Sequence, residues 1–242
     1  MSLRAIDTEF DARSDTPPGR DPDECSATLR RYHQRLWSRP LPDGSRFALD
    51  ANGPANSLRC TQRLEGTRLA SDCCNPSYIH WKKAQRIVEH AHADDSAAFE
   101  SRRWTVGGSI VWPSQRRKGG QTINGARGFN SRIADRFDLT LECVRRHYAG
   151  IESPMSSVLH RYEDFLSVFI DFDGYVEFFL LQDLVNGQRS TIDFFLPFDD
   201  FEGSGMPRDA ASYMRYRQAA LTFIEQRNAR IGQLACNEVD LP

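Results

Sequence analysis

The residues with the clearest potential for chemistry lie between Thr122 and Arg132. This segment contains Gly125, Arg127 and Gly128, and it runs into a strongly amphipathic stretch. Glycine can turn backbone N–H groups toward one point, and the first turn of a helix leaves up to about four N–H groups unpaired. Together with the Arg127 guanidinium, these donors predict a cradle for an anion such as a phosphate. The predicted binding residues are Asn124, Gly125, Gly128, Asn130 and Arg132.

An ordinary connection between a strand and a helix explains the same residues without a ligand. In that alternative, Asn130 or Ser131 caps the helix and Arg127 pairs with an acidic side chain. The segment lacks the lysine and the fixed spacing that make a phosphate-binding P-loop specific. The sequence also contains no HExxH, GxGxxG, nucleophile-elbow or double CxxC motif. Both interpretations therefore stay open.

Three carboxylates follow along one stripe of the predicted helix. Asp135, Asp138 and Glu142 recur at spacings of 3 and 4, which predicts that they share its exposed face. Such a stripe could hold Mg²⁺ for phosphoryl chemistry. The simpler interpretation is that these acids offset the helix dipole and pair with Arg145 and Arg146. We therefore assign no metal ligands.

Candidate catalytic groups lie in and beside the same helix. Arg127 would stabilise an oxyanion, and Asp135 or Glu142 would serve as an acid, a base or a metal-binding group. His147 follows two arginines near the end of the helix and could transfer a proton on a phosphodiester without a metal. A surface or capping histidine is the more common arrangement. Whether the protein is an enzyme is therefore left open, and no cofactor is assigned.

The elements that must position these residues are short. Residues 1–26 are rich in Asp, Pro and Gly and predict an extended arm that holds neither a helix nor a central strand. Apolar spacing predicts helices over 27–37, 77–92, 132–148, 154–170, 175–185 (with a strand as the competitor) and 209–233. Alternation predicts strands over 46–49, 58–64, 67–70, 104–112, 122–124 and 191–198. The predicted fold is a single α+β domain over 27–242, with antiparallel strands in the first half and a helix-rich second half.

Composition limits the possible partners. The chain has 31 basic and 33 acidic residues, a net charge of −2, which argues against binding to DNA or a membrane by bulk charge. Residues 102–150 hold ten basic and three acidic residues, whereas residues 151–202 hold two basic and eleven acidic residues. These segments either present opposite charges to partners or neutralise each other across an internal contact.

The first residues and the cysteines predict a location. Asp7 and Glu9 stand where a secretory signal needs an apolar core, and no apolar run approaches the roughly 20 residues of a membrane span. The six cysteines are scattered, and the adjacent Cys73 and Cys74 are interpreted as ordinary thiols rather than a redox or metal-binding pair. We predict a soluble, cytoplasmic protein without a membrane partner.

Several stretches of the sequence also carry a family resemblance. The stretches are TINGARG at 122–128, DRFDLTLEC at 135–143, residues 175–185 and residues 194–201. With them the chain resembles a widespread family of bacterial proteins of unknown function. The resemblance extends back to residues 14–17 and 32–33, covers most of the chain and implies no activity. The chain departs from the family's pattern around residues 62–75, where Cys73 and Cys74 stand in a stretch expected to be more apolar.

Two functions from different classes of protein follow. In the first, the protein binds or acts on a nucleotide or an RNA phosphate through the 122–132 turn and the following helix. In the second, it is a non-catalytic binding module whose charged segments dock a protein partner or a second copy of the chain. Loss of nucleotide-induced stabilisation in Arg127→Ala would favour the first function. The oligomeric state is not predicted.

Overall fold

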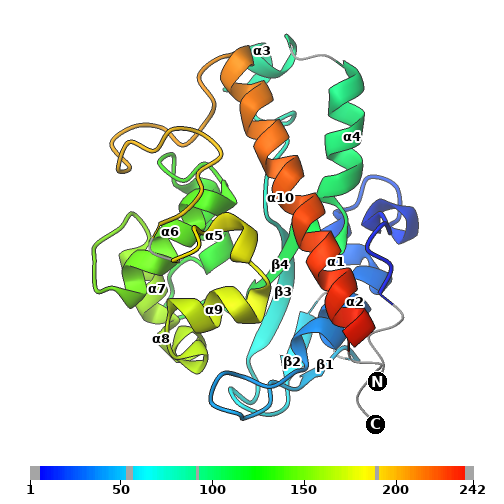
Figure 1. The fold of residues 1–242 in the computed structure, drawn as a ribbon, viewed down its shortest axis with the longest axis vertical. Helices are drawn as coiled ribbons and strands as arrows, with labels where there is room; N and C mark the ends of the chain where they lie inside the picture. Colours follow the sequence, from blue (N-terminus) through cyan, green and yellow to red (C-terminus); the bar gives the residue numbers. More distant parts are fainter. Residues whose placement is uncertain (1–5, 53–56, 91–92, 189–190, 238–242) are drawn as a thin grey trace.

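A four-stranded antiparallel sheet, in the order β1-β2-β3-β4, runs through the computed structural model (Figure 1), which describes residues 6–52, 57–90, 93–188 and 191–237. In the β3–β4 pair, Ala70 faces Trp112 and Cys73 faces Ser109. The β4 strand is buried along its whole length, so both of its faces are covered. The strands are β1 (Leu49–Asp50), β2 (Ser57–Cys60), β3 (Arg68–Cys73) and β4 (Ser109–Pro113).

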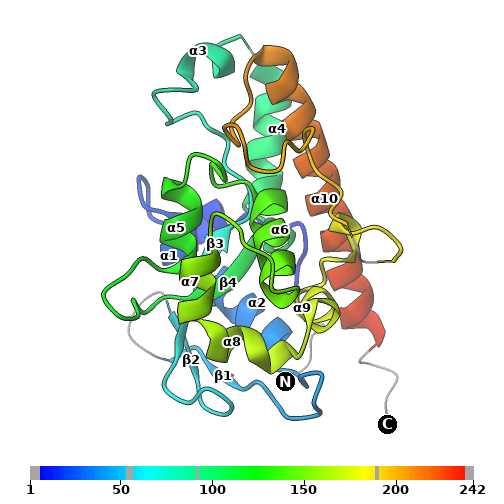
Figure 2. The same cartoon turned by 90° about the vertical axis from the view of Figure 1, so that its left-hand side faces the viewer.

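Helices surround this sheet (Figures 1 and 2). Those of the first half, with 3-10 helices labelled η, are η2 (Ala12–Asp15), α1 (Pro22–Cys25), α2 (Ala27–Trp37), α3 (Gln85–Val88), α4 (Ala93–Arg103) and η3 (Val106–Gly108). Those of the second half are α5 (Ile123–Phe129), α6 (Phe137–Tyr148), α7 (Ser156–Arg161), α8 (Glu163–Leu166), η4 (Ser167–Phe169), α9 (Phe172–Phe179), η5 (Gln182–Leu184) and α10 (Ala210–Asn237). Strands in the first half and helices in the second confirm the predicted α+β class.

The long helix α10 fastens several elements together. It runs beside α4 (Figure 1), and its buried Arg227 donates hydrogen bonds to backbone carbonyls in η3, β4 and α9. The hydroxyls of Tyr213 and Tyr216 donate to the carbonyls of Ser77 and Pro76. The segment that follows β3 is therefore held against α10. None of the helices that the structure describes is both long and apolar enough to cross a membrane.

Aromatic rings form the core between α2 and the helices of the second half. The ring of Phe179 lies 5.2 Å from Trp37, 5.1 Å from Phe169 and 4.9 Å from Tyr175, measured between centroids. All four side chains are fully buried. Because such rings remove large apolar areas from water, this cluster stabilises the packing of α9 against α2.

The N-terminal arm contains helical turns. The carboxylate of Asp21 accepts a hydrogen bond from Asp23 N at the start of α1, and Pro22 takes the first helical position, where no N–H group is required. Ala12 and Pro22 are buried. The prediction that residues 1–26 cannot hold a helix is therefore wrong, because the fold covers these short turns.

Two of the predicted strands are corrected. Residues 122–124 do not form a strand: the Thr122 hydroxyl accepts a hydrogen bond from Gly125 N at 3.0 Å and caps α5. A polar cap outweighs the short β-like pattern. Residues 191–198 form only one isolated bridge, between Ile192 and Val185.

The helix predictions are confirmed where residues next to the helix, such as a capping side chain, fix its start or end. Residues 27–37 coincide with α2, and Ser26 caps it by accepting a hydrogen bond from Leu29 N at 3.0 Å. The terminal helix is also confirmed as α10. The structure instead divides 154–170 into α7, α8 and η4, and it adds the unpredicted α4. Within the predicted helix 77–92 it places only α3 among residues 77–90, and residues 91–92 lie outside the described residues.

Candidate functional site

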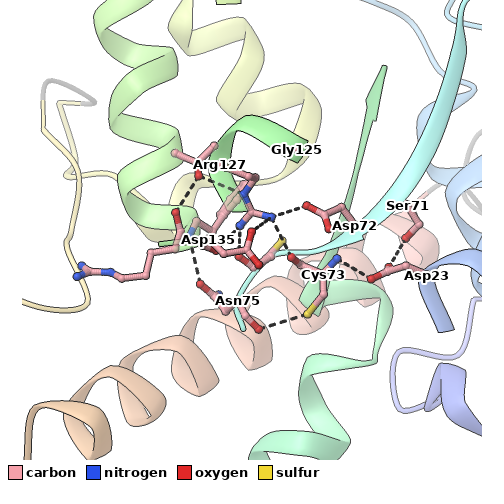
Figure 3. Close-up of polar contacts among 12 residues, drawn as sticks. Asp23, Ser71, Asp72, Cys73, Asn75, Gly125, Arg127 and Asp135 are labelled. Carbon is pink, nitrogen blue, oxygen red and sulfur yellow. Dashed lines mark hydrogen bonds and ion pairs between the residues drawn. The ribbon is translucent and has the colours of Figure 1, made fainter. Parts of the chain in front are cut away.

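Arg127 lies at the centre of the candidate site (Figure 3), and its side chain is 0% exposed. All five guanidinium N–H groups are used inside the protein: Nε donates to Thr140, Nη1 to the Asp72 carboxylate and the Cys73 carbonyl, and Nη2 to the carbonyls of Cys74 and Asp135. The prediction that Arg127 is free to bind an anion is therefore wrong. The alternative, in which Arg127 pairs with an acidic side chain, describes the geometry.

The backbone around α5 explains how this arginine is enclosed. The helix ends at Phe129, and a tight turn over 130–135 brings Asp135 N to the carbonyl of Arg127 at 3.0 Å. Ala134 and Asp135 adopt positive φ angles of 48° and 62° in this turn. The apolar spacing predicts a helix that begins at residue 132. Because of this turn, α6 begins at Phe137 instead.

Two carboxylates lie on either side of Arg127 (Figure 3). Asp72 comes from β3, and Asp135 Oδ1 lies 3.2 Å from Arg127 Nη1. Burial raises the pKa of Asp72 and of Asp135 despite the nearby guanidinium. One cation thus serves two carboxylates, and each carboxyl retains its proton to a higher pH than an exposed aspartate.

Asp135 faces a cleft of about 590 Å³ between the N-terminal arm and residues 76–81, here called the arm cleft. Its walls combine guanidinium groups with aromatic rings. Arg20 forms no side-chain hydrogen bond or ion pair in the described part of the chain, while Arg103 stacks 4.4 Å above the ring of Trp104. Trp81 is half-buried in the same wall. Cations and rings together suit a ligand with a negative charge and an aromatic group.

Asp72 faces a second cleft, of about 390 Å³, here called the strand cleft. Asp23 and Asn124 also line it, and Asp21 lines both this cleft and the arm cleft. Asp23 accepts hydrogen bonds from the Ser71 hydroxyl at 2.7 Å and from Cys73 N at 2.8 Å. The two clefts therefore meet at the arm, with Arg127 buried behind both of their carboxylates.

A buried chain of hydrogen bonds leads to Asp23. Trp37 Nε1 donates to His33 Nδ1 at 2.9 Å, so the neutral imidazole carries its proton on Nε2. This Nε2 lies 3.0 Å from the hydroxyl of Ser71, which in turn donates to Asp23. Burial lowers the pKa of His33 to about 3. His33 is therefore a donor that positions Ser71 rather than a base that could activate it.

The remaining predicted binding residues are dispersed. Asn124 is exposed in the strand cleft, whereas Asn130 Nδ2 donates to the Pro154 carbonyl at 3.2 Å. Gly125 and Gly128 lie inside α5 and do not adopt positive φ angles, so the predicted glycine turn is wrong. Arg132 is exposed and lines a separate cleft.

The carboxylate stripe of α6 is buried rather than exposed, which corrects the prediction for Asp138 and Glu142. Asp138 is 0% exposed and Glu142 is 3% exposed. Asp138 pairs with Arg136, and Glu142 accepts hydrogen bonds from two other arginines, at 145 and 146. Their charges are neutralised inside the protein, so neither lines the arm cleft or the strand cleft. Among the described residues, no three His, Cys, Asp or Glu side chains are grouped to hold a metal ion.

The predicted catalytic groups do not converge on one point. Arg127 and Asp135 are in contact, but His147 is near the far end of α6, about 15 Å from its start at about 1.5 Å per residue. His147 Nε2 lies 2.9 Å from a Glu163 carboxylate oxygen, and burial lowers the pKa of His147. Glu142 and His147 therefore belong to helix packing.

Residues outside the predicted set complete the site. Asp23, Arg20, Trp81 and Arg103 come from segments distant from 122–132, so no pattern within that stretch points to them. Arg103 also donates to the Asn75 carbonyl, which joins α4 to the end of β3. Cys73 and Cys74 contribute backbone carbonyls, and burial raises the pKa of both thiols, which keeps them protonated.

These features define an α+β protein with a buried arginine between two carboxylates, each of which faces its own cleft. The sequence pattern of a family of unknown function, DUF6994, matches residues 6–231. The chain belongs to this family, which confirms the resemblance seen in the sequence. No curated protein and no solved structure matches the chain.

Proposed function

We propose that the protein binds a nucleotide in the arm cleft. The observation that carries this proposal is the unpaired Arg20 guanidinium in a wall that also presents Trp81 and Trp104. A phosphate would pair with Arg20, and the base would stack on an indole ring. The volume, about 590 Å³, is within the usual range of about 300–1,000 Å³ for small-ligand sites.

The charges of the arm cleft support an anionic ligand. Arg13 is paired with Asp11, and Arg103 with Glu100, so these two cations are already partly neutralised. Arg20 is not paired, and the raised pKa of Asp135 limits the negative charge that this residue adds to the cleft. The carboxylate of Asp21, which also lines the cleft, accepts a hydrogen bond from Asp23 N. Asp135 in its protonated form can also donate a hydrogen bond to a phosphate oxygen.

Calorimetric titration with AMP, adenosine and inorganic phosphate tests this proposal. We expect AMP to bind more tightly than either fragment, because it uses both the cation and the rings. Arg20→Ala should weaken AMP binding by about tenfold, the loss expected for one charge-assisted hydrogen bond of about 1.5 kcal/mol. Trp81→Ala should weaken the binding of adenosine and of AMP by similar factors.

Arg116→Ala is the matched control, since Arg116 is an exposed arginine outside this cleft. It should leave AMP binding unchanged. Equal effects of Arg20→Ala and Arg116→Ala would contradict the proposal. Absence of binding by AMP, adenosine and phosphate would favour the non-catalytic protein-interaction module.

A further inference from the structure

A third cleft, of about 320 Å³, is lined by the loop that leads into α10 and by residues of α6 and α10. Figure 1 shows this loop beside the start of α10. We call this cleft the loop cleft. Its apolar wall is substantial for its size and includes buried or half-buried side chains from both the loop and α6. These apolar residues are Leu139, Leu196, Phe198, Phe201 and Met206.

The loop cleft is held in shape by buried polar contacts. Arg136 Nη1 donates to the Gly205 carbonyl at 3.0 Å, and Gly205 N donates to the Ser131 carbonyl at 2.9 Å. A Cβ on Gly205 would stand 2.7 Å from the carbonyls of residues 132 and 133, so the loop approaches this turn as closely as glycine permits. Asp138 fixes Arg136 and also accepts a hydrogen bond from Phe195 N at 2.9 Å. These contacts fix the loop against α6 and so define the shape of the cleft.

The charged rim of the loop cleft is only partly neutralised. Arg132 and Arg215 are exposed and form no ion pair in the part of the chain that the structure describes. Arg208 lies 3.5 Å from Asp199, a contact that is open to solvent. Hydrogen bonds from Ser212 and the nearby Arg215 guanidinium lower the pKa of Asp209, so its carboxylate is charged. Three arginines (Arg132, Arg208 and Arg215) thus face two aspartates, which leaves one excess positive charge above an apolar wall.

We propose that the loop cleft binds a small organic acid, a carboxylate attached to an aromatic or branched aliphatic group. The carboxylate would pair with Arg132 and Arg215, whose planar guanidinium groups match its two oxygens. The apolar group would cover Leu196 and Met206, which a free inorganic anion could not do. This site is separate from the arm cleft and does not depend on the nucleotide proposal.

Calorimetric titration of the full chain with phenylpropanoate, 4-methylpentanoate, phenylpropanamide and inorganic phosphate tests the inference. We expect both acids to bind, and the neutral amide and phosphate to bind at least about tenfold more weakly. Arg132→Ala and Arg215→Ala should each weaken the binding of both acids by about tenfold. Met206→Gln should weaken this binding as well. Binding of the amide or of phosphate as tight as that of the acids would overturn the proposal.

Two controls separate this site from the others. Arg59→Ala removes an exposed arginine of β2 outside the loop cleft and should leave acid binding unchanged, and so should Arg20→Ala in the arm cleft. If Arg132→Ala and Arg215→Ala bind the acids like the wild type while their melting temperatures are unchanged, the site is not the loop cleft. Failure of both acids to bind the wild-type protein at millimolar concentration would likewise overturn the proposal.

Discussion

At the scale of single residues, the chemistry of the candidate site rests on where each carboxyl faces. Asp72 and Asp135 share the buried Arg127, yet they open into different clefts. Arg127 is therefore a positioning residue, because it holds both carboxyls without reaching a ligand itself. In the arm cleft, the charged groups available to a ligand include Asp135 and the unpaired Arg20.

The protonation of Asp135 gives a prediction for nucleotide binding. Because burial raises its pKa, the carboxyl is neutral at lower pH and becomes a negative charge that repels a phosphate as the pH rises. Binding of cyclic AMP, whose phosphodiester keeps one negative charge, should weaken as the pH rises through the raised pKa of Asp135. A repulsion of about 1 kcal/mol, expected for two charges about 4 Å apart in water, would raise the dissociation constant about fivefold.

Asp135→Asn imitates the neutral carboxyl and should remove this dependence. The variant should bind cyclic AMP at high pH about as tightly as the wild type does at low pH. Parallel pH profiles for the variant and the wild type, measured by calorimetric titration, would refute a role for Asp135 in facing the ligand.

At the scale of elements, one side chain joins α5 to β3 and to the turn before α6. Arg127 contacts the Asp72 side chain and three backbone carbonyls, two of them at the end of β3. Because these acceptors are shielded from water, the loss of the guanidinium leaves them without a donor. Arg127 therefore supplies donors to carbonyls at the end of β3, beyond the residues of this strand that pair with β2.

Arg127→Met should lower the free energy of unfolding by about 3–5 kcal/mol, the cost of leaving several buried acceptors without a donor. Urea denaturation measures this loss. In the double variant Arg127→Met/Asp72→Asn the loss should be smaller than the sum of the two single losses, because the contact between the two side chains can be lost only once. The exposed Arg116→Met is the control and should change stability by no more than about 0.5 kcal/mol. A loss in Arg127→Met no larger than this control would show that the network is dispensable.

At the scale of the whole molecule, buried polar chains connect segments that are far apart in sequence. His33 of α2 contacts Trp37, Ser71 of β3 and Ser109 of β4, and through Ser71 it is linked to Asp23 of the arm. Because all of these groups are satisfied only in the folded state, the arrangement favours one packing of the arm, α2 and the sheet.

This chain of contacts predicts an acid-sensitive fold. The pKa of His33 is lowered to about 3, whereas the unfolded chain has the ordinary value of about 6.5, so only the unfolded state binds the proton between these limits. The neutral His33 makes its full contribution to the free energy of unfolding above pH 6.5. As the pH falls below this value, the free energy of unfolding decreases by about 1.4 kcal/mol per pH unit.

His33→Asn retains an acceptor for Trp37 but does not titrate. The variant should be less stable than the wild type at pH 7, and the difference should shrink steadily between pH 6.5 and 4.5 in urea denaturation. A difference that stays constant over this range would show that His33 does not control the acid sensitivity. The carboxylates present in both proteins cancel in this comparison.

Local sequence signals were sufficient for some of the elements. The cap at Ser26 and the apolar spacing behind it specify α2, and similar spacing specifies α10. The α+β class and the antiparallel strands of the first half also follow from alternation and turn residues. For the two helices the deciding interactions are between residues close in the chain, so a short window of sequence contains them, whereas the β3–β4 pairing joins Leu69 to Pro113.

Whether a polar group is free or occupied was decided only by tertiary structure. The partners of Arg127 include Asp72 and the carbonyls of Cys73 and Cys74, which are more than 50 positions away. The Asp138 and Glu142 stripe became buried because arginines neutralise it, and helical spacing alone cannot distinguish a solvated charged face from a paired one. The sequence by itself determined the α+β class, helices such as α2 and α10, and the residue types of the predicted site. The fold decided which donors face solvent, because burial and long-range pairing depend on segments that meet only after folding.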